Sequence, residues 1–501
     1  MCTDKEEDMR YKRALLVQAK YDSTFSNVFP AGIGYISEFL TSHNIENDVY
    51  DLNVSRNTED ILFEKISRYD PDIIGFSMMS LNYKYNYAVM ERLKNRFPHI
   101  TIAAGGAHVS TMREDVLRDC LAIDFGVVLE GEYTILELMR GGKAFSETMG
   151  LIYRDNGKIS YSGDRAFIQD LDSLPYPKYA RFEKKDYSTL MSVFSSRGCP
   201  FECTYCPVRL AIGRRFVARS PKSVVDELEH HYNQGYREFS FRDDNFTLIQ
   251  ERVYAICDEI EKRRFKGLYL MCDNGVRADK IDYKMLKRMK DVGFRMIGLG
   301  VEAGDDKILK SLKKSSTVKV MENAIKTACD LGYIVELYFL IGSPGETWQD
   351  FEKTVALACK YPVMIASFYH ILPYPNTELF ALAKNNNYLL RSPVEYLNDG
   401  SQRRNTPFLS TPEFPEELRK KAYDYAYKTT QACVMKTRRE YSRKHAYEKF
   451  RQMGFGDPLA SIFTKMYTFG FIQDFVLNSR MISNIKKDIK KWKMLSKNNK
   501  G

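Results

Sequence analysis

From Ser195 to Pro207 the chain reads Ser-Ser-Arg-Gly-Cys-Pro-Phe-Glu-Cys-Thr-Tyr-Cys-Pro. The segment sets Cys199, Cys203 and Cys206 in a Cys-x3-Cys-x2-Cys spacing. Three thiolates that lie so close in a tight loop can hold three irons of a [4Fe–4S] cluster. The fourth iron would then lack a protein ligand and could bind a small molecule. The spacing therefore predicts an open cluster site.

Two other kinds of cysteine site fit this spacing less well. A closed structural zinc site needs a fourth cysteine or histidine, and the sequence has no histidine between His108 and His230. A ferredoxin-type cluster also needs a fourth cysteine. Unpaired or zinc-binding cysteines are therefore the weaker interpretation.

The sequence around this segment alternates between short apolar runs and amphipathic stretches. Six strand–helix steps, at spacings of about 30 to 45 residues, predict a partial or full parallel barrel. In such a barrel the reacting groups lie on the loops that follow the strands. The cysteine segment follows the first strand. The expected strands are Thr189–Phe194, Glu238–Phe241, Gly267–Met271, Arg295–Gly300, Val335–Ile341 and Ile365–Ile371.

The N-terminal part alternates in the same way, in steps of roughly 25 residues. This pattern is typical of a doubly wound α/β domain, whose ligands bind at the carboxyl ends of the strands. Helical patterns lie between the strands, for example at Gly32–Ser42, Tyr85–Arg96 and Glu114–Cys120. The expected strands are Arg13–Gln18, Asn47–Leu52, Asp72–Ser77, Ile102–Ala104 and Phe125–Leu129.

The segment between the two α/β regions predicts a connection with one small hairpin. Asp155-Asn156-Gly157 is a strong turn signal, and Leu174-Pro175-Tyr176-Pro177 interrupts regular structure. The 501 residues, 44% hydrophobic and 28% charged, are ordinary for a globular protein of about three domains. We expect a doubly wound domain over 1–145, the connection over 146–188, the barrel over 189–410 and a helical basic segment over 411–501.

Charge and cysteine usage give further expectations. The net charge is +10, and residues 411–501 hold 20 Lys and Arg against 9 Asp and Glu, so this last segment is the basic part. No signal peptide or membrane-spanning stretch is expected, and ten cysteines in this length do not form a secreted disulfide framework. We expect a cytoplasmic protein with reduced thiols, in which Cys257, Cys272, Cys329, Cys359 and Cys433 are small buried hydrophobic residues.

The cysteine loop resembles that of the radical S-adenosylmethionine (SAM) superfamily. The family's pattern is Cys-x3-Cys-x-aromatic-Cys, which Cys199, Cys203, Tyr205 and Cys206 match. The resemblance implies that the open iron chelates SAM, and that an electron from the reduced cluster cleaves SAM to methionine and a 5′-deoxyadenosyl radical. It also implies an external low-potential electron donor of flavodoxin or ferredoxin type.

The same resemblance implies SAM contacts at the ends of later strands. Phe241–Phe246 follows the second barrel strand, where the family binds the SAM amino group. Glu302 matches the carboxylate that holds the ribose hydroxyls, and a carboxylate can accept both hydrogen bonds of a diol. Arg277 could pair with a carboxylate. The implied SAM-binding residues are Tyr205, Asp244, Asn245, Arg277, Glu302, Gly342, Ser343 and Pro344.

The N-terminal domain resembles the cobalamin-binding domain of cobalamin-dependent radical SAM enzymes. Paired glycines at the end of a strand give room for a long nucleotide tail. The chain has no Asp-x-His-x-x-Gly after the first strand, so it lacks the histidine that ligates cobalt in many cobalamin proteins. His108 is expected to be a partly exposed polar residue rather than a ligand. The implied cobalamin-binding residues are Ser77, Met79, Gly105, Gly106 and Glu130.

The combined resemblance implies cobalamin-dependent methylation of an unactivated carbon or phosphorus centre, in which methylcobalamin carries the methyl group. The alternative is an oxidative cyclase or another carbon–carbon bond-forming enzyme without methyl transfer. Methylthiotransferases that act on tRNA need three N-terminal cysteines, whereas the first 198 residues hold only Cys2 and Cys120. No nucleic-acid partner is therefore expected. A non-catalytic cluster scaffold has no feature in its favour, and the catalytic residues stay unknown.

The C-terminal segment combines an apolar and aromatic stretch, Ile462–Leu477, with the basic stretch Lys486–Lys500. An apolar face beside a basic cluster can bind an anionic membrane surface, in which case the substrate could be a lipid or an isoprenoid. Packing of a helical cap against the barrel is the alternative. The substrate is expected to be a small molecule or a lipid.

Overall fold

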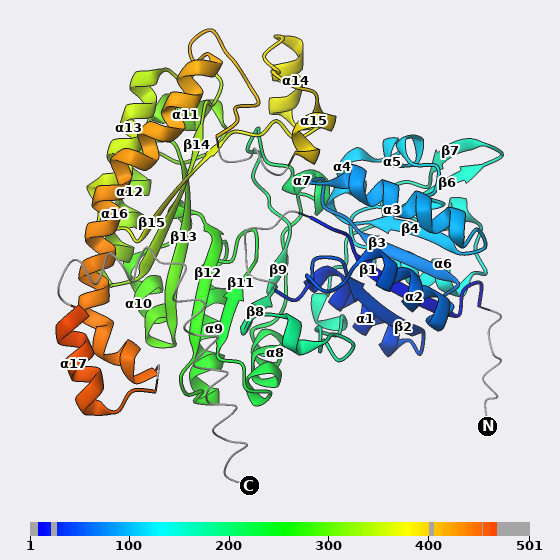
Figure 1. Ribbon diagram of the computed structural model, residues 1–501, viewed down its shortest axis with the longest axis horizontal. Helices are drawn as coiled ribbons and strands as arrows, with labels where there is room; N and C mark the ends of the chain where they lie inside the picture. Colours follow the sequence, from blue (N-terminus) through cyan, green and yellow to red (C-terminus); the bar gives the residue numbers. More distant parts are fainter. Residues whose placement is uncertain (1–8, 22–27, 400–404, 453, 468–501) are drawn as a thin grey trace.

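The structure, a computed structural model, describes residues 9–21, 28–399, 405–452 and 454–467. Two β-sheets form two α/β units that lie side by side, with a long helix along the far side of the second unit (Figure 1). The fold class expected from the sequence is confirmed. In both units the buried faces of the strands are packed against helices, which is how parallel sheets are normally covered.

The N-terminal sheet has seven strands in the order β2-β1-β3-β4-β5-β6-β7. The pairs from β2 to β5 are parallel. The order reverses at β1, as in a doubly wound fold, and the carboxyl ends of β1 to β5 share one edge. The first five strands are β1 (Arg13–Gln18), β2 (Glu46–Asp51), β3 (Ile73–Ser77), β4 (Thr101–Gly105) and β5 (Phe125–Val127).

Within the described residues, six helices cover this sheet, of which the sequence patterns predicted α1, α3 and α5. Helix α2 begins at a side-chain cap, since Thr58 accepts a hydrogen bond from the amide of Ile61. The helices are α1 (Ala31–Ser42), α2 (Glu59–Tyr69), α3 (Tyr83–Arg96), α4 (Ala107–Met112), α5 (Asp115–Asp119) and α6 (Glu132–Arg140).

The predicted hairpin forms, but it belongs to the N-terminal sheet. Strands β6 (Leu151–Asp155) and β7 (Lys158–Tyr161) continue the sheet antiparallel to β5. Asn156 and Gly157 both have positive φ, 50° and 80°, as a two-residue hairpin turn requires. Leu151, Ile152 and Tyr153 are buried, so the apolar face of the hairpin is covered only when it joins the sheet.

The second sheet has six strands in the order β15-β14-β13-β12-β11-β8, all parallel. This is the predicted partial barrel. A two-stranded ribbon of β9 (Ser196–Arg197) and β10 (Val217–Ala218) stands beside the first strand. The barrel strands are β8 (Leu190–Val193), β11 (Glu238–Phe241), β12 (Tyr269–Val276), β13 (Phe294–Glu302), β14 (Ile334–Ile341) and β15 (Ile365–His370).

Most helices of the second unit cover the outer face of this sheet. Several begin at side-chain caps, such as Ser220, Asp282 and Thr317, and each cap satisfies an amide that the helix leaves free. The helices are α7 (Val208–Ala211), α8 (Pro221–Asn233), α9 (Gln250–Arg263), α10 (Tyr283–Asp291), α11 (Asp306–Ser311), α12 (Val318–Asp330), α13 (Trp348–Lys360), α14 (Glu378–Asn385) and α15 (Pro393–Asn398).

The C-terminal region begins with the long helix α16 (Glu416–Gln452), which packs against α13 and β15 and is followed by α17 (Asp457–Tyr467). Phe463 of α17 packs against Phe450 and Phe455. The predicted basic stretch at 486–500, and residues 468–477 of the apolar stretch, lie outside the described residues. Among the described residues, no helix has the length and apolar character needed to cross a membrane.

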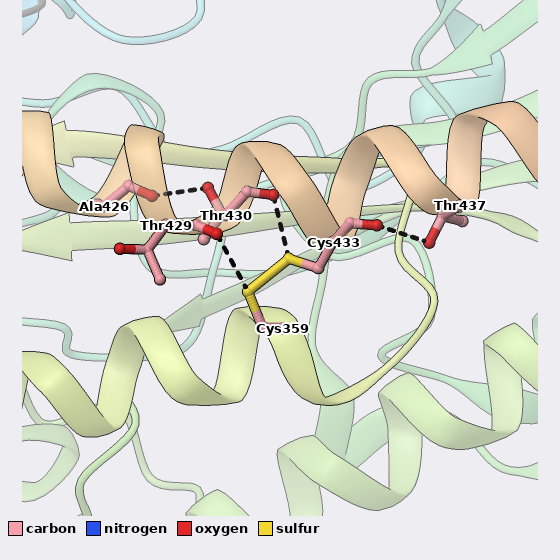
Figure 2. Close-up of a disulfide and its surroundings, with 6 residues drawn as sticks. All are labelled: Cys359, Ala426, Thr429, Thr430, Cys433 and Thr437. Carbon is pink, nitrogen blue, oxygen red and sulfur yellow. Dashed lines mark hydrogen bonds between the residues drawn. A yellow bond between two sulfur atoms is a disulfide. The ribbon is translucent and has the colours of Figure 1, made fainter. Parts of the chain in front are cut away.

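The expectation of reduced, buried thiols is wrong for Cys359 and Cys433. These residues form a disulfide that joins α13 to α16 (Figure 2). The two helices lie side by side, which brings the Cα atoms to 5.7 Å although 74 residues separate them in sequence. Cys257 and Cys272 are buried free thiols as expected, whereas Cys329 is only half-buried.

Candidate functional site

The cysteine segment forms a tight loop directly after β8 and β9. The loop is held from outside by two backbone hydrogen bonds, from the amide of Thr204 to the carbonyl of Leu312 (3.1 Å) and from the amide of Leu379 to the carbonyl of Thr204 (2.9 Å). Gly198 has φ of +86°, and a Cβ there would overlap the carbonyl of Arg215. The loop therefore needs a glycine at this position.

The three thiols act on one another electrostatically. Burial raises the pKa of Cys206 to about 12, and Cys203 and Cys199 add to the rise. In the described part of the chain, no three Cys, His, Asp or Glu side chains converge on a single metal ion. A cubane accepts its thiolates at separate iron corners, so three sulfur donors on one short loop fit a [4Fe–4S] cluster.

The predicted SAM residues at the end of β11 lie in a buried polar site. Asp243 accepts hydrogen bonds from the hydroxyls of Ser195 and Ser196, at 2.9 and 2.6 Å. Burial raises the pKa of Asp244 to about 6, with Asp243 adding to the effect. Asn245 is 3% exposed, and its Nδ2 has no partner among the described residues. An unpartnered buried amide fits a polar ligand that is not part of the chain.

A similar arrangement follows β14. Gly342 has φ of +81°, and a Cβ there would overlap the guanidinium of Arg419. The amides of Gly342 and Ser343 donate to Glu346 Oε2 at 2.6 and 3.0 Å. Ser343 Oγ and Glu346 Oε1 are buried without partners in the described residues. Pro344 follows in the same turn, so the predicted Gly-Ser-Pro segment lines a second polar site.

Glu302 ends β13 with its carboxylate buried. Its Oε1 lies 2.7 Å from Lys314 Nζ, and both side chains are less than 10% exposed. Burial raises the pKa of the Tyr205 phenol, and Glu302 adds to the rise. The structure thus brings together the predicted ribose ligand and the aromatic residue of the cysteine loop. It adds a lysine that the sequence patterns did not select.

Arg277 is engaged with the protein rather than open to a ligand. Its Nε bonds to Asp279 at 2.9 Å and its Nη2 donates to the carbonyl of Lys314 at 2.9 Å. Its guanidinium also lies 3.5 Å over the ring of Phe201. Arg277 therefore joins the cysteine loop to the turn that carries Lys314. A bidentate contact with SAM carboxylate would require these bonds to change.

The inner face of the barrel carries a polar network that the sequence patterns did not reveal. Asp273 accepts a hydrogen bond from Ser240 and lies 3.4 Å from Arg242. The hydroxyl of Tyr338 donates to the carbonyl of Asp273 at 2.6 Å. Ser240, Asp273 and Tyr338 come from β11, β12 and β14. Tyr338 reaches across β13, where Gly298 leaves room for its ring. In the sequence of β14, Glu336 and Tyr338 alternate with apolar residues, and this alternation is the signal that could have identified the polar face.

The predicted cobalamin residues lie along the carboxyl edge of the N-terminal sheet. Ser77 and Gly105 end β3 and β4, and Met79 is 45% exposed beside them. Gly106 has φ of +90°, and a Cβ there would lie 2.8 Å from the carbonyl of Met78. Gly106 therefore lets the chain pass close to the backbone of Met78, at the edge where ligands of doubly wound sheets bind. Part of the loop after β1, residues 22–27, lies outside the described residues.

The expectation that His108 is partly exposed is wrong. Its side chain is 1% exposed, Nε2 lies 2.8 Å from the hydroxyl of Tyr87, and the ring stacks on Tyr83. Burial lowers its pKa to about 3. His108 belongs to α4, and its ring packs against Tyr83 and Tyr87 of α3. The ring therefore stays neutral and is held inside the domain, where it is not exposed to a ligand.

The two sheets are joined by a buried charge cluster. Arg197, in the cysteine segment, donates to Glu130 at 2.9 Å and to Glu132 at 2.7 Å, both in the N-terminal domain. Burial acts to lower the pKa of Arg197, but Glu132 and Glu130 outweigh it and raise the pKa. Glu130, predicted to bind cobalamin, also accepts from the amide of Ile168 at 2.7 Å. Its carboxylate is therefore used to fix the cysteine segment against the N-terminal domain.

The chain matches two known protein families over the two α/β units. Residues 193–358 match the Radical SAM superfamily and residues 22–139 match the B12 binding domain. A relative in Pyrococcus horikoshii, named an uncharacterized methyltransferase, is 32% identical over 399 residues, which cover 76% of this chain and 85% of that protein. The chain belongs to the radical SAM superfamily. It carries a B12 binding domain in front of the barrel.

Two further proteins, one a relative in sequence and one a solved structure, match about three quarters of the chain. The anaerobic magnesium-protoporphyrin IX monomethyl ester cyclase of Rubrivivax gelatinosus is 26% identical, over 74% of this chain and 69% of that protein. The solved structure of TsrM, a radical SAM methyltransferase from Kitasatospora setae with cobalamin and a [4Fe–4S] cluster bound, superposes with a TM-score of 0.67. It is 19% identical, over 76% of this chain and 79% of TsrM. The shared fold includes both α/β units.

Proposed function

We propose that this radical SAM enzyme is a cobalamin-dependent methyltransferase that acts on an unactivated carbon or phosphorus centre. The observation that supports the proposal most is the pairing of an open three-cysteine loop with a B12 binding domain, joined by the Arg197 ion pairs. The relative with 32% identity is also named a methyltransferase. A reduced cluster supplies the electron that cleaves SAM, and cobalamin supplies a carrier for a methyl group.

We assign roles to the residues of both sites. Cys199, Cys203 and Cys206 hold the cluster, and the buried polar sites that follow β11 and β14 hold SAM. The ribose is held by Glu302, and the adenine lies beside Tyr205. The proposed SAM contacts also include Asp244, Asn245, Arg277, Gly342, Ser343 and Pro344, and the proposed cobalamin contacts are Ser77, Met79, Gly105, Gly106 and Glu130.

The proposal predicts two products from SAM. Protein purified anaerobically with cobalamin supplied should contain both iron and cobalt. With SAM and dithionite it should release 5′-deoxyadenosine, the product of radical cleavage, and S-adenosylhomocysteine, the product of methyl transfer. Protein without cobalamin should make only the first. Release of 5′-deoxyadenosine without S-adenosylhomocysteine from cobalt-loaded protein would favour the cyclase-type chemistry named for the Rubrivivax relative.

We further propose that a flavodoxin or ferredoxin type of protein delivers the electron beside the cysteine loop. A hollow of about 720 Å³ is lined on one side by Pro200, Phe201 and Glu202 of that loop. Lys310 and Lys313 lie on its other side. The opposite flank of the loop is covered, because α7 packs against α4 of the N-terminal domain. Acidic carriers would approach the open flank, where lysines attract carboxylates.

Charge reversal at the hollow should slow protein-mediated reduction only. With Lys310→Glu and Lys313→Glu combined, we expect reduction of the cluster by flavodoxin hydroquinone to slow about tenfold at low salt, with unchanged reduction by dithionite. Stopped-flow bleaching of the cluster absorbance measures both rates. The control combines Lys222→Glu and Lys287→Glu, which lie on α8 and α10. Equal flavodoxin rates for the two double variants would rule out this docking face.

A cytoplasmic location with peripheral contact between Lys486–Gly501 and an anionic membrane is also a proposal. It rests on the sequence pattern alone, since these residues lie outside the described part of the chain. A lipid or isoprenoid substrate depends on the same proposal. Otherwise the substrate is a small molecule that enters between the two carboxyl edges.

A further inference from the structure

The ion pair of Lys314 and Glu302 is unusual because it is buried beside the cysteine loop. Lys314 and Glu302 are each 7% exposed, and the distance between Nζ and Oε1 is 2.7 Å. A lysine side chain is almost never buried to this extent unless it has a charged partner. The two side chains also leave no space for a side chain at position 300, which is a glycine. A Cβ on Gly300 would lie 2.9 Å from the glutamate oxygen and 3.1 Å from the lysine nitrogen.

The backbone that presents this pair is strained on both sides. Glu302 has φ of +66°, and the register between β13 and β14 shifts between Gly300 and Glu302. Lys313 and Ser315, which flank the lysine, have φ of +53° and +52°. Left-handed conformations of residues other than glycine are uncommon and cost free energy, and they cluster at functional sites. The strained backbone on both sides therefore places these two side chains in contact with each other.

The turn that carries Lys314 is bonded directly to the cysteine loop. The carbonyl of Leu312 accepts from the amide of Thr204 at 3.1 Å, and the carbonyl of Lys314 accepts from Arg277, which covers Phe201. The turn that carries Lys314 therefore lies directly against the loop that carries Cys203.

We propose that Lys314 is a positioning residue for the cofactor site, which holds Glu302 toward the nucleotide and places a fixed positive charge beside the cluster. A positive charge favours the more negative, reduced cluster and so raises its reduction potential. The same ion pair fixes the carboxylate rotamer that the ribose hydroxyls need, as partners of a ligand-binding group commonly do. This role rests on the proposed cofactor assignments.

The test separates these two effects from activity. Full-length, cluster-loaded protein with Lys314→Met is compared with wild type, with Lys314→Arg, and with Lys319→Met as the control, an exposed lysine in the first turn of α12. The midpoint potential is measured by EPR-monitored titration without SAM. Affinity is measured with S-adenosylhomocysteine, which is not cleaved.

We expect Lys314→Met to lower the midpoint potential and to weaken S-adenosylhomocysteine binding about tenfold or more. Lys314→Arg should keep the potential and recover most of the affinity, and Lys319→Met should match wild type in both. If Lys314→Met fails to fold or to take up a cluster, Lys314→Gln replaces it, since the amide can still bond to Glu302 while the charge is lost. That variant should lower the potential with a smaller loss of affinity.

Unchanged potential and affinity in the Lys314 variants would overturn the role of the lysine while leaving the cofactor assignment intact. Failure of wild-type protein to bind S-adenosylhomocysteine would instead overturn the assignment of the site. The two failures are therefore distinguishable in one set of measurements.

Discussion

Replacement of Cys203 by alanine is expected to abolish SAM cleavage. Only three thiolates are available to the cluster in the proposed site, on one loop between β9 and α7. Loss of one leaves two corners of the cubane without a protein ligand. After anaerobic reconstitution, we expect iron and sulfide contents to fall to the background of the reagents. Formation of 5′-deoxyadenosine should become undetectable by liquid chromatography.

The control for this variant is Cys329→Ala, which removes a half-buried free thiol at the end of α12, far along the chain from the cysteine loop. It should retain wild-type iron content and 5′-deoxyadenosine formation. Alanine at Cys199 or Cys206 should behave like alanine at Cys203. A Cys203→Ala protein that still carries a stoichiometric cluster would show that another residue serves as the third ligand, and would refute the assignment.

Replacement of Arg197 by methionine is expected to cause the largest loss of stability. Arg197 pairs with Glu130 and Glu132, and all three side chains are at most 20% exposed. Removal of one partner of a buried ion pair leaves uncompensated charge, which costs about 3–5 kcal/mol. We expect the apparent free energy of unfolding, measured by urea titration of the full chain, to fall by that amount. Because the pair joins the two α/β units, the N-terminal domain should unfold earlier.

An exposed pair in the same region provides the control. Arg214 and Glu202 lie 3.0 Å apart, with side chains 59% and 55% exposed. Exposed ion pairs contribute little, so Arg214→Met should cost roughly 1 kcal/mol or less. Combining Arg197→Met with Glu130→Gln and Glu132→Gln should recover part of the loss, because no carboxylate is then left unpaired. Equal losses for Arg197→Met and Arg214→Met would contradict the buried-pair explanation.

Local sequence patterns predicted the strands of both sheets well. All eleven expected strands are present, because buried parallel strands need continuous apolar runs, which are visible in the sequence. The helices named as examples correspond to α1, α3 and α5, and the patterns placed the 151–161 hairpin in a connection rather than in the sheet. The hairpin is recognisable from its own turn residues, but its partner strand β5 is identified only when the sheet is assembled.

The disulfide illustrates a second limit. Cys359 and Cys433 each lie in an amphipathic stretch that suggests a buried apolar residue, and nothing in either stretch indicates a partner 74 residues away. Their pairing follows from the way α16 lies along α13 (Figure 2). The burial of His108 could not be predicted from the sequence either, because it depends on how the chain that follows β4 packs.

By itself, the sequence determined the fold class, the spacing of the three cysteines and the superfamily, because these depend on residues that are close together in the chain. Only the tertiary structure decided which charges meet. In the sequence, Lys314 is one of two adjacent lysines, which is typical of an exposed position. Arg197 lies next to the cysteines in a predicted loop. Their partners are 12 to 67 residues away. Pairing at such distances is set by strand register, a bulge in β13 and the packing of two sheets, which no local pattern encodes.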